Sequence, residues 1–340
     1  MQAMWWNPEN FSQKIDNLRM RSAIIKEIRR FFDDQEFDEV ETPILQICPV
    51  IDTHIRAFAT DLRNVSGEVE KTMYLHTSPE FAMKKLMVAG CSKIYQICHV
   101  FRNAEGSKRH SPEFTMIEWY RTNVDYIDIM QDCEGLLRAC AKAANIQEYK
   151  YQNKICDPFQ EFERLTVCEA FKQYADIDLA KFLDDKDGFR QAVQAFGLHT
   201  ADDDEWDDLF FRVMDEYIEP KLGIGRPTFL CDYPISMASL SKPKSDDPRF
   251  AERFELYVCG VELANAFSEL TDAEEQMRRY HIEMDEKERL YGERYPLDED
   301  FIAALKHGLP PSGGIALGVD RLVMLATGAE DISDIQWCET

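Results

Sequence analysis

The stretch FRNAEGSKRHSPEFTMIEWY, from Phe101 to Tyr120, decides which kind of sheet this chain builds. Two sets of side chains alternate over residues 94–102 and again over residues 114–121, on either side of a loop rich in Gly, Ser and Lys. Successive side chains of a strand point to opposite faces, so the pattern predicts two antiparallel strands joined by a long loop. One face of the second strand carries Phe114, Met116, Glu118 and Tyr120. A face that is partly polar indicates the floor of a ligand site.

The loop between these strands is basic in a chain that is strongly acidic. Arg102, Lys108, Arg109 and His110 fall within nine positions, although 63 acidic against 39 basic residues give a formal net charge of −24. Such an excess of acid repels a phosphate backbone and disfavours extended nucleic-acid binding. A small anionic ligand in a local basic pocket fits this distribution of charge.

Length and composition are typical of a soluble globular protein. Its 340 residues suit one elaborate domain or two modest ones, and no apolar run approaches the roughly eighteen residues that span a bilayer. The start, MQAMWWNPEN, lacks a secretory signal, and the ten cysteines form no CxxC pair. We therefore expect a cytoplasmic protein with no membrane segment and no structural zinc.

The rest of the sequence predicts helices and strands around the central pair. A helical apolar stripe runs to about Phe32, Ser78 caps a helix that stops at Gly90, and a further stripe covers residues 129–144. Later strands are expected at 228–232 and 252–267, then a charged helix over 271–291, and a final strand, turn and helix in GGIALGVDRLVMLATG. We predict a single domain over residues 1–340, in which 145–222 form a mainly helical insertion.

Two arginines are candidates for holding an anion. Arg102 ends a strand, where a guanidinium can grip a phosphate through two parallel hydrogen bonds. Arg321, in GVDR, lies near the start of a helix. The structural alternatives are a surface pairing of Arg102 with Glu105 or Glu113, and an Asp320–Arg321 pair.

Two glutamates in VELANAFSEL are candidates for a metal site. Glu262 and Glu269 are seven residues apart, so an undistorted strand points them to opposite faces. A bulge near Asn265 and Ala266 would bring both to one ligand. Paired carboxylates beside a triphosphate suit Mg²⁺, although two solvent-facing glutamates are the simpler interpretation.

Three segments occur together in the order of a known family. ETPIL, FRNAEGSKRHSPEFTMIEWY and GGIALGVDRLVML resemble the three signature motifs of class II aminoacyl-tRNA synthetases, and HSPEFTMIEWY and VELANAFSELTDAEEQ resemble the lysine branch. The resemblance implies an α+β catalytic domain, an antiparallel sheet flanked by helices, and a homodimer formed through the helix and strand that end at ETPIL.

The size of the chain, its acidity and the absence of an anticodon-binding barrel resemble one paralogous group, the elongation factor P lysine ligases. This resemblance implies that the chain uses ATP and Mg²⁺ to activate (R)-β-lysine, transfers it to a lysine of elongation factor P, and binds no tRNA anticodon. Ala316 stands where lysyl-tRNA synthetases carry glycine, and its methyl group would favour a β-amino acid by at most about 1–3 kcal/mol.

The resemblance also assigns roles to single residues. Arg102 grips the α-phosphate, Phe114 and Arg321 enclose the adenine, Glu262 holds Mg²⁺, and the nucleotide site is completed by Asn103, His110, Ser111, Leu263 and Gly318. The substrate amines are received by Ser78, Pro79, Glu80, Glu118, Tyr120 and Glu269, with Ala316 beside them. Arg102 and Arg321 are the catalytic candidates.

Three departures from the family pattern leave alternatives open. Ala104 replaces a glutamate, Ser111 an asparagine, and Ala266 a glycine whose replacement costs about 1 kcal/mol if that position has positive φ. The alternatives are a lysine-activating enzyme with another acceptor, a related amide ligase that makes asparagine, and a non-catalytic paralogue that senses an amino acid.

Overall fold

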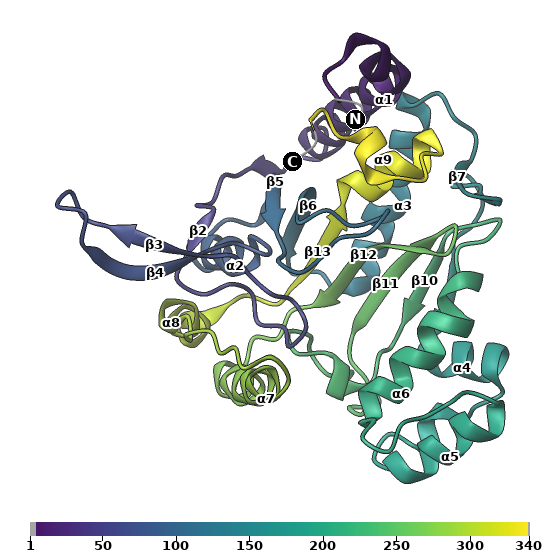
Figure 1. Cartoon of the computed structure of the whole chain (residues 1–340). Coiled ribbons are helices and arrows are strands. Elements are labelled where there is room, and N and C mark those ends of the chain that lie inside the picture. The colour runs from purple at the N-terminus through teal and green to yellow at the C-terminus, as the bar shows by residue number, and fades with distance from the viewer. Residues whose placement is uncertain (1–4, 339–340) are drawn as a thin grey trace.

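An eight-stranded sheet forms the centre of the structure, a computed structural model that describes residues 5–338 (Figure 1). Its strands lie in the order β1 (Asp38–Glu39), β5 (Lys93–Phe101), β6 (Glu113–Thr122), β13 (Ser312–Gly318), β12 (Val261–Ser268), β11 (Arg253–Val258), β10 (Thr228–Cys231) and β9 (Glu163–Thr166). The inner six run antiparallel to one another, which confirms the predicted α+β class and antiparallel sheet. The two edge strands run parallel to their neighbours, and this was not expected.

The predicted central pair is present as β5 and β6. Val100 lies opposite Phe114 and Ile94 opposite Tyr120, and the loop between the two strands carries the basic residues. The faces of β6 divide as expected. Trp119 and Ile117 are fully buried in the core on one side, and the partly polar face looks the other way.

Three helices cover the apolar face of the sheet: α1 (Pro8–Asp33), α3 (Tyr126–Ala143) and α9 (Val319–Thr327). Asn7 begins α1 by accepting a hydrogen bond from the Glu9 backbone N–H at 2.9 Å, and Pro8 fills the first turn, where its missing N–H costs nothing. Asp125 and Asp128 form a reciprocal capping box at the start of α3. These helices hold the sheet from behind and leave its other face for a site.

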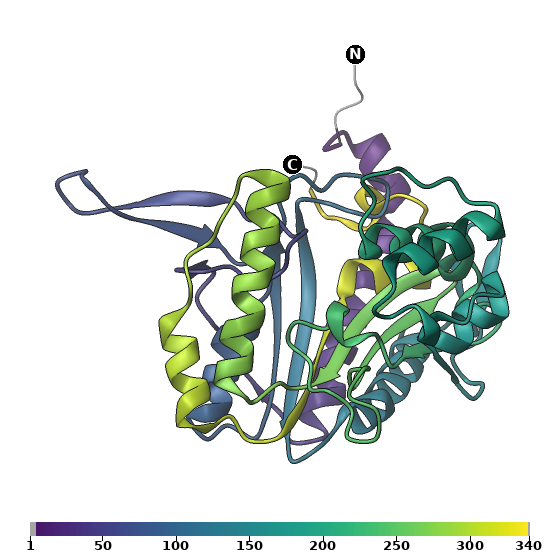
Figure 2. The same ribbon diagram turned by 90° about the horizontal axis from the view of Figure 1, so that it is seen from below.

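A second group of helices lies beside that other face: α2 (Glu80–Val88), α7 (Ala273–Tyr291) and α8 (Glu299–Gly308). Phe81 of α2 stacks on Phe301 of α8, with ring centroids 4.2 Å apart, and α8 was not predicted. Pro79 is the cap of α2, so Ser78 stands one position further out than expected, although its hydroxyl oxygen accepts from the Glu80 N–H at 3.1 Å. From this group projects a small sheet of β2 (Leu45–Gln46), β4 (Val69–Leu75) and β3 (Ala59–Arg63), which stands away from the body in Figure 2.

The segment 145–222 has its own apolar core, around Phe171, Phe189 and Phe210. Its helices are α4 (Val167–Ala175), α5 (Lys186–Phe196) and α6 (Trp206–Val213), followed by a π turn at Met214–Ile218 and a 3₁₀ turn at Glu219–Lys221. The segment also holds the hairpin β7 (Tyr149–Tyr151) and β8 (Lys154–Cys156), and it supplies β9 to the large sheet.

A bulge in the β11–β12 pair sets the direction of the two candidate glutamates. Leu256 lies opposite Ala264 and Tyr257 opposite Glu262, so Leu263 is the extra residue. The bulge is therefore real, but its predicted position at Asn265 and Ala266 is wrong. Ala266 is a regular strand residue outside the positive-φ set, so it carries none of the cost considered above.

Candidate active site

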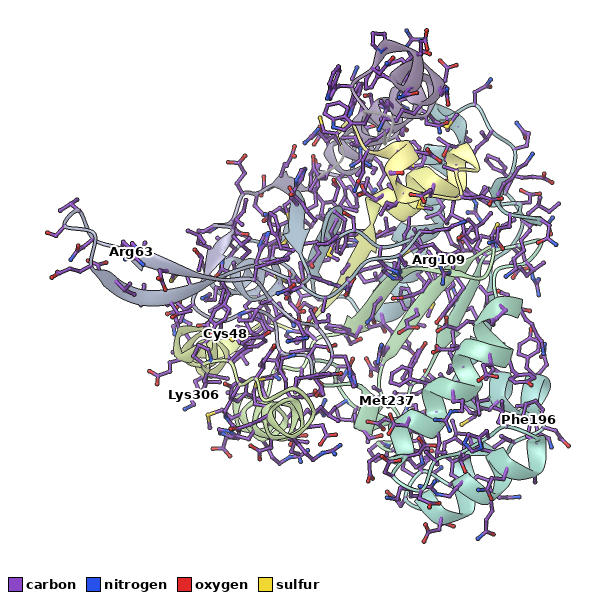
Figure 3. The ribbon with its side chains drawn as sticks, in the orientation of Figure 1. Cys48, Arg63, Arg109, Phe196, Met237 and Lys306 are labelled. Atoms are coloured by element: carbon purple, nitrogen blue, oxygen red, sulfur yellow. The ribbon has the colours of Figure 1, made fainter. Side chains whose placement is uncertain are left out.

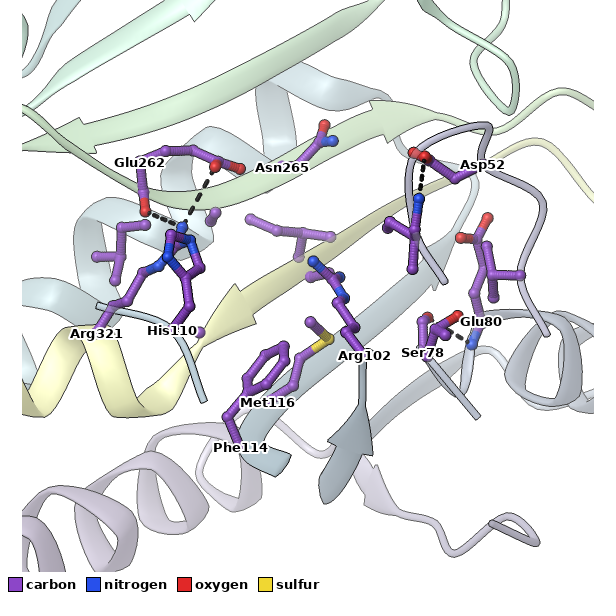
Figure 4. Close-up of a pocket in the computed structure, with 18 of the residues that line it drawn as sticks. Asp52, Ser78, Glu80, Arg102, His110, Phe114, Met116, Glu262, Asn265 and Arg321 are labelled. Atoms are coloured by element: carbon purple, nitrogen blue, oxygen red, sulfur yellow. Dashed lines mark hydrogen bonds and ion pairs between the residues drawn. The ribbon is translucent and has the colours of Figure 1, made fainter. Parts of the chain in front are cut away.

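A cavity of about 300 Å³ lies over the partly polar face of β6, β13 and β12 (Figure 4). Twelve of the sixteen predicted site residues line it: Ser78, Glu80, Arg102, His110, Ser111, Phe114, Tyr120, Glu262, Leu263, Ala316, Gly318 and Arg321. Figure 4 shows Arg321, His110 and Glu262 at one end and Ser78 and Glu80 at the other, with Arg102 between them. The bulge at Leu263 makes this possible, because it turns Glu262 and Asn265 to the same cavity.

We call Arg102, His110, Phe114 and Arg321 the basic end of the cavity. The Arg102 guanidinium lies 5.3 Å from the centre of the Phe114 ring, a cation–π distance. Its Nε is buried without a hydrogen-bond partner among the described residues, and Glu113 is bound instead by His99, Nδ1 to Oε1 at 2.6 Å. A buried donor without a partner is costly, so the geometry fits an anion that is supplied from outside.

Arg321 is held by two side chains of the cavity. Its Nη1 donates to the Glu262 carbonyl at 2.7 Å and lies 3.3 Å from Oε2, and its Nη2 lies 2.6 Å from His110 Nε2. The alternative Asp320–Arg321 pair is wrong, because Asp320 is buried against Arg21 at 2.6 Å. A guanidinium only donates, so Nε2 of His110 accepts and its Nδ1 carries the proton toward Ser107 Oγ, 2.7 Å away. Burial, with repulsion from Arg321 and Arg109, lowers the pKa of His110 to about 4, so this ring is neutral at pH 7.

Buried carboxylates form the opposite end, which we call the acidic end and define as Ser78, Glu80, Lys84, Glu118, Tyr120 and Glu269. Glu118 and Glu269 are each 1% exposed and lie just behind the lining residues. Tyr120 donates its hydroxyl to Glu118 Oε2 at 2.8 Å, and Ser78 donates to Oε1 of the same carboxylate. Both oxygens of Glu118 are therefore held in place before any ligand arrives.

Lys84 is the one cation of the acidic end, and the sequence interpretation missed it. Its ammonium is 1% exposed and pairs with both Glu80 and Glu269. The spacing of four residues from Glu80 on a helix was the available signal. Burial by itself lowers the pKa of Lys84, but the charges of Glu269 and Glu80 outweigh it and raise that pKa.

Two carboxylates of the acidic end, Glu118 and Glu269, have a raised pKa and hold protons more tightly than usual. Burial, with repulsion from Glu80, raises the pKa of Glu118 to about 8. Burial also raises the pKa of Glu269 to about 8, against the opposing charge of Lys84. Each ionised carboxylate lacks the water that would stabilise it, so a cation that enters this end replaces that water.

Gly314 lets Glu269 and Tyr120 of the acidic end approach the backbone of β13 closely. A Cβ at this position would lie 2.2 Å from Glu269 Oε1 and 2.4 Å from the Tyr120 ring, distances that no side chain can occupy. At Gly318, four residues along the same strand, a Cβ would meet nothing closer than Arg321 side-chain carbons at 3.7 Å. Glu269 and Tyr120 therefore leave no room for a side chain at residue 314, whereas the open cavity lies beside Gly318.

Four predicted residues do not line the cavity: Asn103, Pro79, Glu118 and Glu269. The side-chain oxygen of Asn103 accepts a hydrogen bond from the Ala104 N–H at 2.8 Å. Pro79 is the N-cap residue of α2. Ala104 itself has φ 60° and is exposed, and its neighbour Glu105 lines the cavity instead. Arg109 and Asp52 also line it and were not assigned a role (Figure 3 places Arg109 beside the sheet).

The residues present fit one magnesium ion that enters with a nucleotide. Among residues 5–338 no group of three or more His, Cys, Asp or Glu side chains is arranged to hold a metal by itself. Mg²⁺ typically keeps several waters and takes one or two carboxylates together with substrate phosphates. The Glu262 side chain faces the cavity and is 38% exposed, so a hydrated ion can reach it.

The comparisons agree with this geometry. A family described as tRNA synthetases class II (D, K and N) matches residues 9–337, and the chain belongs to that family. The chain is similar to proteins named elongation factor P–(R)-β-lysine ligase: it is 42% identical over 332 residues to that of Yersinia enterocolitica and 40% identical over 332 residues to that of Enterobacter sp. (strain 638). Each alignment covers 97% of this chain and 96% of the relative. Over residues 5–338, no helix is both long enough and apolar enough to span a bilayer.

Proposed function

We propose that this protein activates (R)-β-lysine with ATP and transfers it to the ε-amine of a lysine on elongation factor P. One observation carries the proposal: a single cavity joins a basic end, which suits phosphates, to a buried acidic end, which suits ammonium groups. The named relatives point the same way, since they cover nearly the whole chain.

The charges of the acidic end favour a substrate with two amines. Glu80, Glu118 and Glu269 carry three negative charges when ionised, and Lys84 carries one positive charge, which leaves two negative charges uncompensated. A buried charge without a partner is costly, so two further ammonium groups complete this set. A diamino acid supplies both and leaves its carboxylate free to point toward Arg102.

Activation is a displacement at phosphorus. A carboxylate oxygen of the substrate attacks the α-phosphorus of ATP, a new P–O bond forms, and pyrophosphate leaves with the electrons of the broken bond. Arg102 neutralises charge on the α-phosphate and Phe114 and Arg321 enclose the adenine, so positioning and electrostatics supply the catalysis. Mg²⁺, held by Glu262, would draw charge from the phosphates when bound.

Transfer then forms an amide. The neutral ε-amine of the acceptor lysine attacks the carbonyl carbon, the bond from that carbon to the phosphate oxygen breaks, and AMP leaves with its electron pair. The amine releases a proton to water, so that atoms and charge balance. No protein nucleophile takes part in either step.

The direct test combines the protein, ATP, Mg²⁺, (R)-β-lysine and elongation factor P, and weighs the intact factor. We expect a mass increase of one β-lysyl group on the wild type and none with Arg102→Ala or without ATP. Pyrophosphate exchange with a panel of amino acids separates the alternatives. Exchange that is best with aspartate would support an asparagine-forming ligase, exchange with lysine but no modified factor another acceptor, and binding without exchange an amino-acid sensor.

We also infer a homodimer formed through the end of α1 and the strand that follows it. Ile44, Leu45 and Ile47 are 43%, 43% and 50% exposed, an apolar group that water does not favour. Sedimentation velocity on the wild type and on a variant with Ile44→Asp and Ile47→Asp tests this inference. A wild-type monomer at micromolar concentration would contradict it.

A further inference from the structure

A second cavity, of about 310 Å³, lies between α6 and α7. It shares five lining residues with the active-site cavity: Ile51, Asp52, Leu240, Asn265 and Phe267. Met237 also lines it and stands between the ribbons of α7 and α6 in Figure 3. The two cavities therefore meet at one wall, and a ligand in the second cavity lies next to the site of adenylate formation.

Acidic side chains dominate the lining of the second cavity. Six carboxylates line it, against two arginines: Asp52, Glu205, Asp207, Asp208, Glu283 and Glu286 against Arg253 and Arg289. Arg289 is already paired with Glu286, and Arg253 donates to Glu255 at 2.7 Å. Two of the six carboxylates are paired as well, Glu286 with Arg289 and Glu205 with Lys186 at 3.0 Å. Four carboxylates therefore have no ion-pair partner among the described residues, and the cavity attracts cations.

Exposed apolar side chains border the same cavity. Phe211 of α6 and Ile282 and Leu290 of α7 line it, and they are 42%, 55% and 41% exposed. Large apolar groups on two facing helices, beside carboxylates, are the composition of a protein-binding surface.

The second cavity also contains a polar group that lacks a partner. Ser241 is 1% exposed, and its hydroxyl has no hydrogen-bond partner among the described residues, although it lines the cavity. Buried hydroxyls normally make at least one hydrogen bond, so this one indicates that a polar ligand completes it.

We propose that the second cavity is the docking site for the segment of the acceptor protein that carries the lysine to be modified. This inference rests on the function proposed above. The acidic lining attracts the cationic lysine, the exposed apolar groups offer contacts to the residues that flank it, and the shared lining residues place the docked segment next to the site of adenylate formation. A second copy of this chain, with net charge −24, and a nucleic acid are both repelled by six carboxylates.

The test separates docking from activation. The variant Asp207→Asn with Glu286→Gln removes two charges of the second cavity and touches none of the residues assigned to ATP or β-lysine. Its matched control is Asp184→Asn with Glu161→Gln, two exposed carboxylates outside both cavities. A second pair is Phe211→Ala with the control Phe159→Ala, which is 38% exposed elsewhere.

Two quantities are measured for each variant: pyrophosphate exchange with (R)-β-lysine, and transfer to full-length elongation factor P. We expect exchange within twofold of wild type in all variants. For transfer, we expect the KM for elongation factor P to rise about tenfold in the double variant and kcat to change little. Each of the two partly exposed charges contributes up to about fivefold to this rise. Salt should weaken transfer by the wild type more than transfer by the double variant.

The other outcomes are distinct. If the wild type transfers β-lysine and both cavity variants match their controls, the docking site is wrong and the proposed function stands. If the cavity variants lose exchange as much as transfer, the second cavity serves activation, and the docking inference is overturned. If the wild type forms the adenylate with no modified factor, or forms no adenylate, the proposed function fails and this inference fails with it.

Discussion

The basic and acidic ends of the active-site cavity both carry charge, but only the acidic end buries it. Arg102, Phe114 and Arg321 at the basic end are partly exposed, whereas Glu118, Glu269 and Lys84 are each 1% exposed. The partly exposed guanidinium groups can reorganise around a triphosphate, and the buried Nε of Arg102 can then gain the hydrogen-bond partner that it lacks among the described residues. The buried carboxylates are fixed in place, and burial raises the pKa of Glu118 and Glu269. A cation bound beside them would lower these pKa values again. We therefore expect the basic end to supply catalysis and the acidic end to select the substrate.

The largest effect is expected from a substitution at the basic end. Arg102→Ala should reduce adenylate formation about a thousandfold, because one donor aimed at developing charge is worth roughly 10² to 10³ in rate. Pyrophosphate exchange measures the rate. The melting temperature should hold, since Arg102 makes no ion pair among the described side chains. Near-normal exchange would remove Arg102 from its assigned role, and Arg102→Lys, which keeps the charge, serves as the intermediate case.

The next largest effect is expected from a substitution at the acidic end. Glu269→Gln keeps the shape but removes the carboxylate that would pair with a substrate ammonium, so the KM for the diamino acid should rise more than about a hundredfold, because breaking a buried ion pair costs roughly 3–5 kcal/mol. The KM for ATP should change less than threefold. Steady-state kinetics with each substrate varied in turn provide the measurement, and an equal rise in both constants would show that the two ends do not act separately.

Two glycines of β13 sharpen the comparison. Gly314→Ala would displace Glu269 and Tyr120, and we expect it to weaken binding of the amino acid at least tenfold and to lower the melting temperature. Gly318→Ala meets only Arg321 carbons, so it should leave stability unchanged and weaken ATP binding alone. Calorimetric titration of each variant with each ligand separates these effects. Loss of stability in Gly318→Ala would be the contrary result.

The pH dependence of binding should also differ between the ends. Glu118 and Glu269 have pKa values raised to about 8, so below pH 8 they are protonated and an ammonium must displace a proton. Affinity for (R)-β-lysine should therefore rise with pH from 6 to 8, by at most tenfold per unit for each proton released. Titrations in buffers of different ionisation enthalpy count these protons. Glu118→Gln should flatten the rise, and a flat wild-type profile would contradict both shifted pKa values.

The smallest effect concerns the choice between α- and β-amino acids. Ala316 lies opposite Asn265 on β12 and Glu118 on β6, between the two ends of the cavity. Ala316→Gly should move the ratio of kcat/KM toward α-lysine by about tenfold or less, since one methyl group is worth roughly 1–3 kcal/mol. Exchange with both isomers gives the ratio, and an unchanged ratio would reduce Ala316 to a packing residue.

Much of the fold follows from local patterns in the sequence. The alternation on either side of the basic loop predicted β5 and β6, apolar spacing predicted α1 and α3, and α7 lies where a charged helix was expected. The parallel pairing of the edge strands β1 and β9 was not predictable, because each strand is short and its neighbour is distant in the sequence. The helix α8 was missed, although Asp298 at its N-cap and the apolar spacing of Phe301, Ile302 and Leu305 were available signals.

The sequence could not show which charged side chains of the site pair with each other. Asp320 adjoins Arg321 in the chain but pairs with Arg21, almost 300 residues away, and Arg321 binds Glu262 and His110 instead. The bulge at Leu263 was placed two to three residues too far along, because an extra residue leaves no mark in the alternation of a buried strand.

The sequence by itself determined the antiparallel sheet, the family and twelve of the residues that line the cavity, because strand alternation and the three motifs are local properties of the chain. Only the tertiary structure decided the charge state of the site. It placed Lys84 between Glu80 and Glu269, turned His110 into a neutral acceptor, and buried Glu118 away from water. Burial and the distance between remote charges set these properties, and neither quantity is written in the order of the residues.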